Sequence, residues 1–81
     1  MLRPIEKYSR GVTTYYCPYC NVELGWSYEY GGGDAKASCE HFIWQVYGNL
    51  YYDLLAPKLN RNALVRIFSG GSVYILYPKS Q

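Results

Sequence analysis

The chain has 81 residues and a formal net charge of +2, and it contains eleven tyrosines, three cysteines and one histidine. This length fits one small domain, and such a domain buries too little surface to be strongly stable on its own core. A net charge this small does not by itself indicate nucleic-acid binding.

The three cysteines argue against a protein stabilised by a framework of disulfides. An odd number of cysteines cannot all pair within one chain, so a disulfide framework is not expected. We therefore expect a reducing, cytoplasmic or other intracellular location. The first seven residues hold no apolar run, so we expect no signal peptide, and no stretch of the chain approaches the length of a membrane span.

The first half of the chain predicts short strands. Residues 1–10 are polar and favour an N-terminal arm or an edge segment. Residues 12–16 are β-branched and aromatic, and residues 22–30 alternate between apolar and polar, so both stretches predict strands. The glycines at 31–33 interrupt this pattern, and the chain can return as a third short strand over 35–37.

The segment 40–56 predicts one central amphipathic helix. Its apolar residues recur at helical spacing over about four turns and would form one broad apolar face. Ser38 is the expected N-cap, and Pro57 is expected to end the helix. Gly48 would lie inside the helix, at a cost of roughly 1 kcal/mol relative to alanine.

The last third of the chain predicts a β-hairpin. Two apolar runs, at about 63–68 and 73–77, flank Gly70-Gly71. Residues 73–77 are nearly all apolar, so both faces of that strand need cover, which favours a dimer partner. The fold class is therefore α+β, with one domain over 1–81. It consists of a metal-stapled N-terminal hairpin, the central helix and the C-terminal hairpin.

The chemistry-bearing residues lie in two short motifs. Cys17-Pro18-Tyr19-Cys20 and Cys39-Glu40-His41 use every cysteine and the only histidine. Three thiolates and an imidazole form a ligand set that suits one tetrahedral structural Zn²⁺. Asn21 tolerates a positive φ, as a tight turn after the second cysteine would require.

The predicted helix constrains the second motif. Residues two apart on a helix point about 200° away from each other, so they cannot both face one metal. We therefore expect Cys39 in the lead-in to the helix and His41 in its first turn. The metal would then clamp the first hairpin to the start of the helix.

These motifs resemble those of known zinc modules over roughly residues 15–47. The Cys-Pro-x-Cys turn is similar to a zinc-ribbon knuckle, although Asn21 stands where ribbons often have glycine. The stretch from Ser38 to Ile43 is similar to the Cys-x-His helix start of SWIM zinc fingers, a family associated with binding DNA or proteins. The SWIM pattern differs in its first pair, which is Cys-x-Cys. The resemblance implies Cys17, Cys20, Cys39 and His41 as ligands.

Two other interpretations of the cysteines remain open. Cys-Pro-Tyr-Cys also resembles the active-site tetrapeptide of glutaredoxins, in which the first cysteine attacks from a helix N-terminus. That resemblance implies a thiol oxidoreductase using Cys17 and Cys20. Residues 21–30, however, alternate as a strand where that family has a helix. In the other interpretation the protein binds no metal, and Cys39 is simply a small buried residue.

The sequence favours a protein that is not an enzyme. A closed Cys3His site has no open coordination position, so it is expected to be structural. The chain shows no other catalytic constellation, and residues 31–33 lack the Gly-Lys-Ser/Thr ending of a P-loop.

Two binding functions follow. The first is a nucleic-acid-binding or regulatory module, in which exposed aromatic rings stack on bases. The second is a protein-interaction or assembly module, which we expect to be dimeric, because tyrosine and tryptophan favour interfaces. The candidate base-stacking residues are Trp26, Tyr28, Tyr30, Trp44 and Tyr52, and the candidate nucleic-acid-binding cations are Arg3, Lys7, Arg10, Lys36, Lys58, Arg61 and Arg66.

Overall fold

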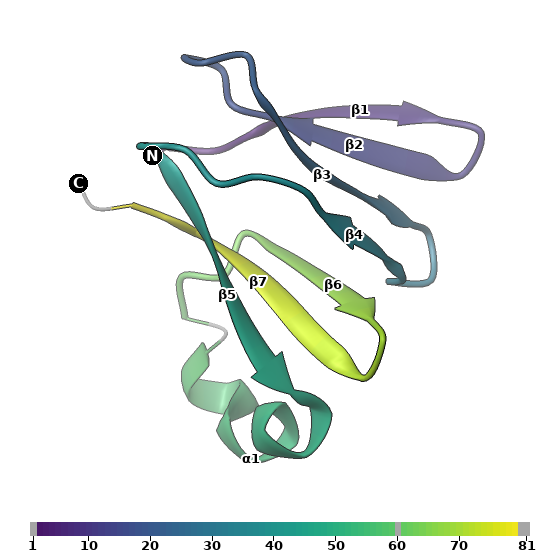
Figure 1. Ribbon diagram of the computed structural model, residues 1–81, viewed down its shortest axis with the longest axis vertical. Helices are drawn as coiled ribbons and strands as arrows, with labels where there is room; N and C mark the ends of the chain where they lie inside the picture. Colours follow the sequence, from purple (N-terminus) through teal and green to yellow (C-terminus); the bar gives the residue numbers. More distant parts are fainter. Residues whose placement is uncertain (1, 60, 80–81) are drawn as a thin grey trace.

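A computed structural model describes residues 2–59 and 61–79 and shows a mixed α+β fold in which strands predominate (Figure 1). The described part of the chain forms seven strands and one helix. In chain order they are β1 (Ile5–Ser9), β2 (Val12–Tyr16), β3 (Glu23–Tyr28), β4 (Gly33–Ala35), β5 (Phe42–Gly48), α1 (Asn49–Leu59), β6 (Val65–Ser69) and β7 (Ser72–Pro78).

The strands form two antiparallel sheets. The first has the order β1-β2-β3-β4, and the second has the order β5-β7-β6. The sheets adjoin where β4 lies beside β6 (Figure 1). There Gly32 and Phe68 form a parallel bridge, and the Phe68 N–H donates to the Gly31 carbonyl at 2.8 Å.

Two tight turns of the same type close the terminal hairpins. Arg10 and Gly11 join β1 to β2 with φ angles of 53° and 80°, and Gly70 and Gly71 join β6 to β7 with 58° and 80°. Positive φ at both central residues is the type I′ geometry, whose twist matches that of the flanking strands. The β6–β7 hairpin lies where the Gly-Gly pattern predicts one.

The core lies between the two sheets. Its fully buried side chains come from both of them: Leu24 from β3, Phe42 from β5, Ile67 from β6 and Leu76 from β7. Tyr15 joins this core, and its hydroxyl shares a buried 2.9 Å hydrogen bond with the Ser27 Oγ. The core therefore depends on keeping the two sheets together.

The central strand β7 is covered on both faces within the chain. Leu76 faces the core between the sheets, and Val73 and Ile75 are also fully buried. Helix α1 packs against β5 and β7, and its Tyr52 ring meets Phe68 edge to face at 6.3 Å. The apolar character of β7 therefore calls for no second chain.

The predicted helix is partly wrong. Residues 42–48 form the strand β5, and the helix begins at Asn49 and continues to Leu59. The apolar pattern of 42–48 also fits alternation, and pairing with β7 over seven residues favours the strand, so tertiary context overrides the helical period. Ser38 caps no helix. Its Oγ accepts from the Trp44 N–H at 3.1 Å.

Two smaller predictions also differ from the structure. Residues 5–9 of the predicted arm or edge segment form the edge strand β1, exposed throughout. The third short strand is Gly33–Ala35, where 35–37 was expected.

Leu76 and Leu54 offer a matched test of this core. Leu76 is fully buried, whereas Leu54 on α1 is 73% exposed. We expect Leu76→Ala to lower the free energy of unfolding by about 2–5 kcal/mol, because it removes buried contacts and leaves a cavity. Leu54→Ala is expected to change it by no more than about 0.5 kcal/mol. Denaturant unfolding measures both, and equal losses would contradict this placement of the core.

Candidate metal centre

Three cysteines and the histidine come together at one point. The ligand atoms of Cys17, Cys20, Cys39 and His41 all lie within 4.8 Å of one another. Cys17 and Cys20 belong to the turn between β2 and β3, and the other two precede β5. The site therefore joins the first sheet to the second.

The Cys17–Cys20 turn is closed by its own backbone. The Asn21 N–H donates to the Cys17 carbonyl at 2.8 Å, and the Cys17 N–H donates to the Val22 carbonyl at 3.1 Å. Asn21 has a φ of 62°, so the predicted positive φ is confirmed. The N–H groups of Tyr19 and Cys20 point to the Cys17 Sγ at 3.4 and 3.3 Å. Such donors stabilise a thiolate.

The second ligand pair lies in a turn and not on a helix. The Cys39 N–H donates to the Phe42 carbonyl at 2.9 Å, and the His41 N–H points to the Cys39 Sγ at 3.4 Å. The expectation that His41 lies in the first turn of a helix is therefore wrong. The turn brings the two side chains to one side, which a helix does not do for residues two apart.

The distances fit a tetrahedral metal. The His41 Nδ1 lies 3.5 Å from the Cys17 Sγ and 3.3 Å from the Cys20 Sγ. Around a tetrahedral Zn²⁺ the sulfur–nitrogen edge is about 3.6 Å and the sulfur–sulfur edge about 3.8 Å. Nδ1 is therefore the ring nitrogen that faces the site. The donor set and the spacing both suit Zn²⁺.

The two cysteines of the turn have different acidities. Burial raises the pKa of the Cys17 thiol, but the N–H groups of Cys20 and Tyr19 outweigh burial and leave it below its usual value. Burial and the neighbouring Cys17 and Cys39 sulfurs raise the pKa of Cys20 to about 11. Of these two thiols, Cys17 is thus the first to ionise. A bound cation would favour ionisation of all three.

Two neighbouring residues contact His41. The Tyr19 ring lies against its imidazole, with ring centroids 4.7 Å apart and planes at 32°. The Lys79 N–H donates to the His41 carbonyl at 2.8 Å, which ties the end of β7 to the site. Sequence reasoning missed both contacts. The Tyr19 contact has a local signal, an aromatic residue inside the Cys-x-x-Cys turn, whereas the Lys79 contact has none.

Trp44 has a structural role that the sequence did not indicate. Its indole N–H donates to the carbonyls of Leu24 and Ala37 at 2.9 and 3.0 Å. The side chain is half-buried and packs against the core. Trp44 therefore links β5 to the first sheet, and its indole N–H is not free for a base.

The predicted nucleic-acid-binding cations are spread over several elements. Arg3 and Arg61 line one hollow. Lys7 lies on β1, with its Nζ 5.3 Å from the centre of the Tyr16 ring. Lys36 pairs with the Glu23 carboxylate at 3.4 Å. Arg10 lies in the β1–β2 turn and Arg66 on β6, and the side chain of Lys58 lies outside the described ones.

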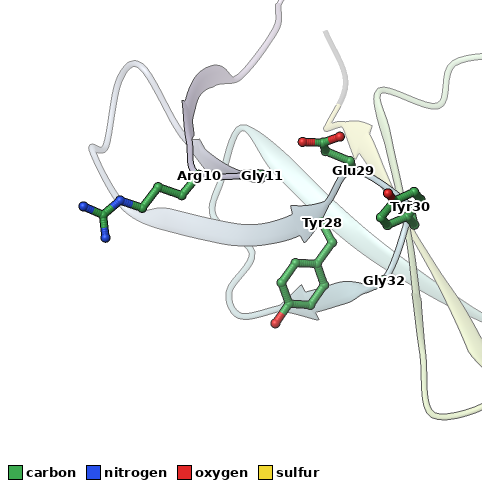
Figure 2. A pocket seen from close by; sticks show the side chains of 6 residues that line it. All are labelled: Arg10, Gly11, Tyr28, Glu29, Tyr30 and Gly32. Atoms are coloured by element: carbon green, nitrogen blue, oxygen red, sulfur yellow. The ribbon is translucent and has the colours of Figure 1, made fainter.

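A hollow of about 340 Å³ lies beside the β1–β2 turn. Figure 2 shows that its side chains do not converge, because Tyr28 and Glu29 point to opposite sides of the chain and Arg10 points away from both. The Glu29 carboxylate is also engaged, since it accepts a 2.5 Å hydrogen bond from the Tyr8 hydroxyl. This hollow therefore offers no set of convergent polar groups of the kind that ligand sites use.

Comparison of the chain with protein-family models, curated proteins and solved structures finds no match. Within the described residues, no helix has the length and apolar character needed to cross a bilayer.

His41 can be tested against its neighbour Glu40, which is exposed. We expect His41→Ala to weaken zinc binding by more than the roughly 10–100-fold that loss of an outer-shell group costs, because it removes a ligand. Glu40→Ala should bind zinc as the parent does. Competition with a chromophoric chelator measures both affinities. Equal affinity in the two variants would show that His41 is not a ligand.

Proposed function

We propose that this chain is a small non-enzymatic protein that binds one structural Zn²⁺ through a Cys3His site and acts as a nucleic-acid-binding module. The convergence of the four ligand atoms within 4.8 Å carries the metal part of the proposal. All four coordination positions are filled by side chains, so the ion has no position for substrate. Its role is to hold the β2–β3 turn against the segment before β5.

The local fold counts against the thiol-oxidoreductase alternative. In that class the attacking cysteine lies at the N-terminus of a helix. Here the Cys17–Cys20 turn leads from β2 into β3. The lowered pKa of Cys17 has a different origin, namely the turn's own N–H groups.

A pair of arginines supports nucleic acid as the partner. Arg3 and Arg61 are far apart in sequence, yet both line a hollow of about 230 Å³ together with Asn62. Its lining includes no acidic residue, and among the described residues neither arginine has an acidic partner. Two guanidinium groups that have no acidic partner among the described residues, and that lie beside one hollow, suit a phosphate, which arginine binds in a bidentate manner.

An exposed apolar surface favours the assembly module as the second candidate. We define the α1 surface as Leu50, Tyr51 and Leu54, which are 78%, 62% and 73% exposed and lie within about one turn of the helix. Contiguous exposed apolar side chains often mark a protein-interaction site. The same surface is where a second copy would pack.

We expect natively purified protein to hold one zinc per chain. Removing the ion with a chelator should lower the melting temperature, because three sulfurs and an imidazole lose the ion that holds two sheets together. Metal analysis and thermal unfolding measure this, and re-addition of zinc is the control. Protein that holds no metal, with Cys17 and Cys20 cycling between thiol and disulfide, would replace this proposal with the oxidoreductase.

We also expect binding to a random-sequence oligonucleotide that weakens steeply as salt rises. Replacing both Arg3 and Arg61 by alanine should reduce the log–log salt slope by about 1.4 on a single strand, or about 0.7 for each lost phosphate contact. Lys36→Ala is the matched control, because Lys36 already pairs with Glu23. Titrations across a salt series measure all three.

The assembly candidate predicts a different result. It requires no nucleic-acid binding at low salt and a dimer by light scattering. Leu54→Lys should then dissociate that dimer, because it places a charge in the α1 surface. A monomer that binds nucleic acid would exclude this candidate.

A further inference from the structure

We propose that the outer face of the four-stranded sheet binds single-stranded nucleic acid, with bases stacked on aromatic rings and phosphates running along β1. This inference rests on the proposed nucleic-acid-binding function and names the surface and the kind of nucleic acid. The outer face is defined by the side chains of Ile5, Lys7, Tyr16, Trp26, Tyr28 and Asp34.

The strand register places these residues on one face. Lys7 lies opposite Thr14, Thr14 opposite Trp26, and Trp26 opposite Asp34, in one row across all four strands. Paired residues share a face of the sheet, and so do residues two apart on a strand. The opposite face carries the buried side chains of Tyr15 and Ser27. One face of the sheet is thus used for the core and the other is left to the solvent.

The aromatic rings on the outer face are accessible and close together. Tyr28 is 53% exposed, and Trp26 is half-buried. Their ring centroids lie 5.0 Å apart with the planes at 81°, so the edge of one ring meets the face of the other. The Lys7 Nζ lies over the Tyr16 ring on the same face. Aromatic rings beside a cation are the elements that single-strand binders combine.

The charges of the outer face differ between its two sides, with cations at β1 and an acidic residue at β4. Exposed Lys7 and Arg10 lie on the β1 side, and exposed Asp34 lies on β4 at the other side. Lys36 and Glu23 neutralise each other. Glu6, the acidic residue of β1, lies opposite Tyr15 and therefore on the other face. Phosphates are attracted to the β1 side and repelled from Asp34, which leaves the bases over Trp26 and Tyr28.

A single strand fits this face better than a duplex. Stacking on a protein ring requires the flat face of a base, and in a duplex those faces are covered by the neighbouring base pairs. The rings lie on an open sheet surface and not on a helix that could enter a groove. The alternative occupant is a protein surface. Such a partner would contact the aromatic rings, but its binding would not depend on having cations at β1 and Asp34 at β4.

The test compares two exposed tyrosines of similar accessibility. Tyr28→Ala removes a ring from the outer face, and Tyr51→Ala removes one that is 62% exposed on α1. Fluorescence anisotropy with a labelled single strand at low salt should show about a tenfold loss of affinity for Tyr28→Ala. Tyr51→Ala should bind as the parent does. Zinc content and far-UV circular dichroism verify that both variants are folded.

Two charge variants test whether the phosphates lie at the β1 side of the outer face. Lys7→Ala should reduce the log–log salt slope by about 0.7, because one phosphate contact is lost. Asp34→Asn should raise affinity, because the repulsion of phosphate is removed. The same strand annealed to its complement should bind more weakly than the single strand.

The outcomes separate this inference from the proposed function. If the parent protein binds no nucleic acid at low salt, the proposed function itself fails. If it binds but Tyr28→Ala binds equally well, or the duplex binds as tightly as the single strand, the outer face is not the site and only this inference fails. Loss of affinity in Tyr28→Ala and Lys7→Ala, but not in Tyr51→Ala, supports it.

Discussion

The arrangement of the molecule depends on one junction, where the turn after β2 meets the segment before β5. Four ligand atoms within 4.8 Å of one another mark that junction. The core is shared by the two sheets, so neither sheet can bury its apolar face if they separate. A short chain gains little from burial alone, and a metal that closes a junction between distant segments reduces the freedom of the unfolded chain. The ligand cluster and the shared core thus stabilise the same contact.

The sequence predicts this cluster well because its information is local. Each ligand pair lies within one short motif, and the chain has no other cysteine or histidine to compete. The turn chemistry is local too, as the positive φ of Asn21 shows. What the sequence could not supply is the backbone around Cys39 and His41. That depends on β5, and β5 depends on pairing with β7, which is far away along the chain.

The helix prediction failed for the same reason. The segment from Phe42 to Gly48 fits both a helical period and an alternating one, and only the presence of β7 decides between them. The two arginines are a second example, because Arg3 and Arg61 line one hollow although they are far apart in the sequence. The motifs and tight turns within a few residues were predictable here. The choice between strand and helix over 42–48, and the contacts between distant segments, were not.

The metal cluster and the outer face of the first sheet are linked through β2 and β3. Cys17 directly follows Tyr16 at the end of β2, and Glu23 begins β3 just after the turn that holds Cys20. That turn sets how β2 and β3 enter the sheet, including the irregular register at Tyr15 and Tyr16. Trp26 and Tyr28 lie on β3, so their positions relative to Lys7 depend on the same pairing. A metal that fixes the turn would therefore hold the aromatic face in shape without touching it. In a chain of 81 residues, the ligand cluster and the exposed aromatic face are therefore not independent of each other.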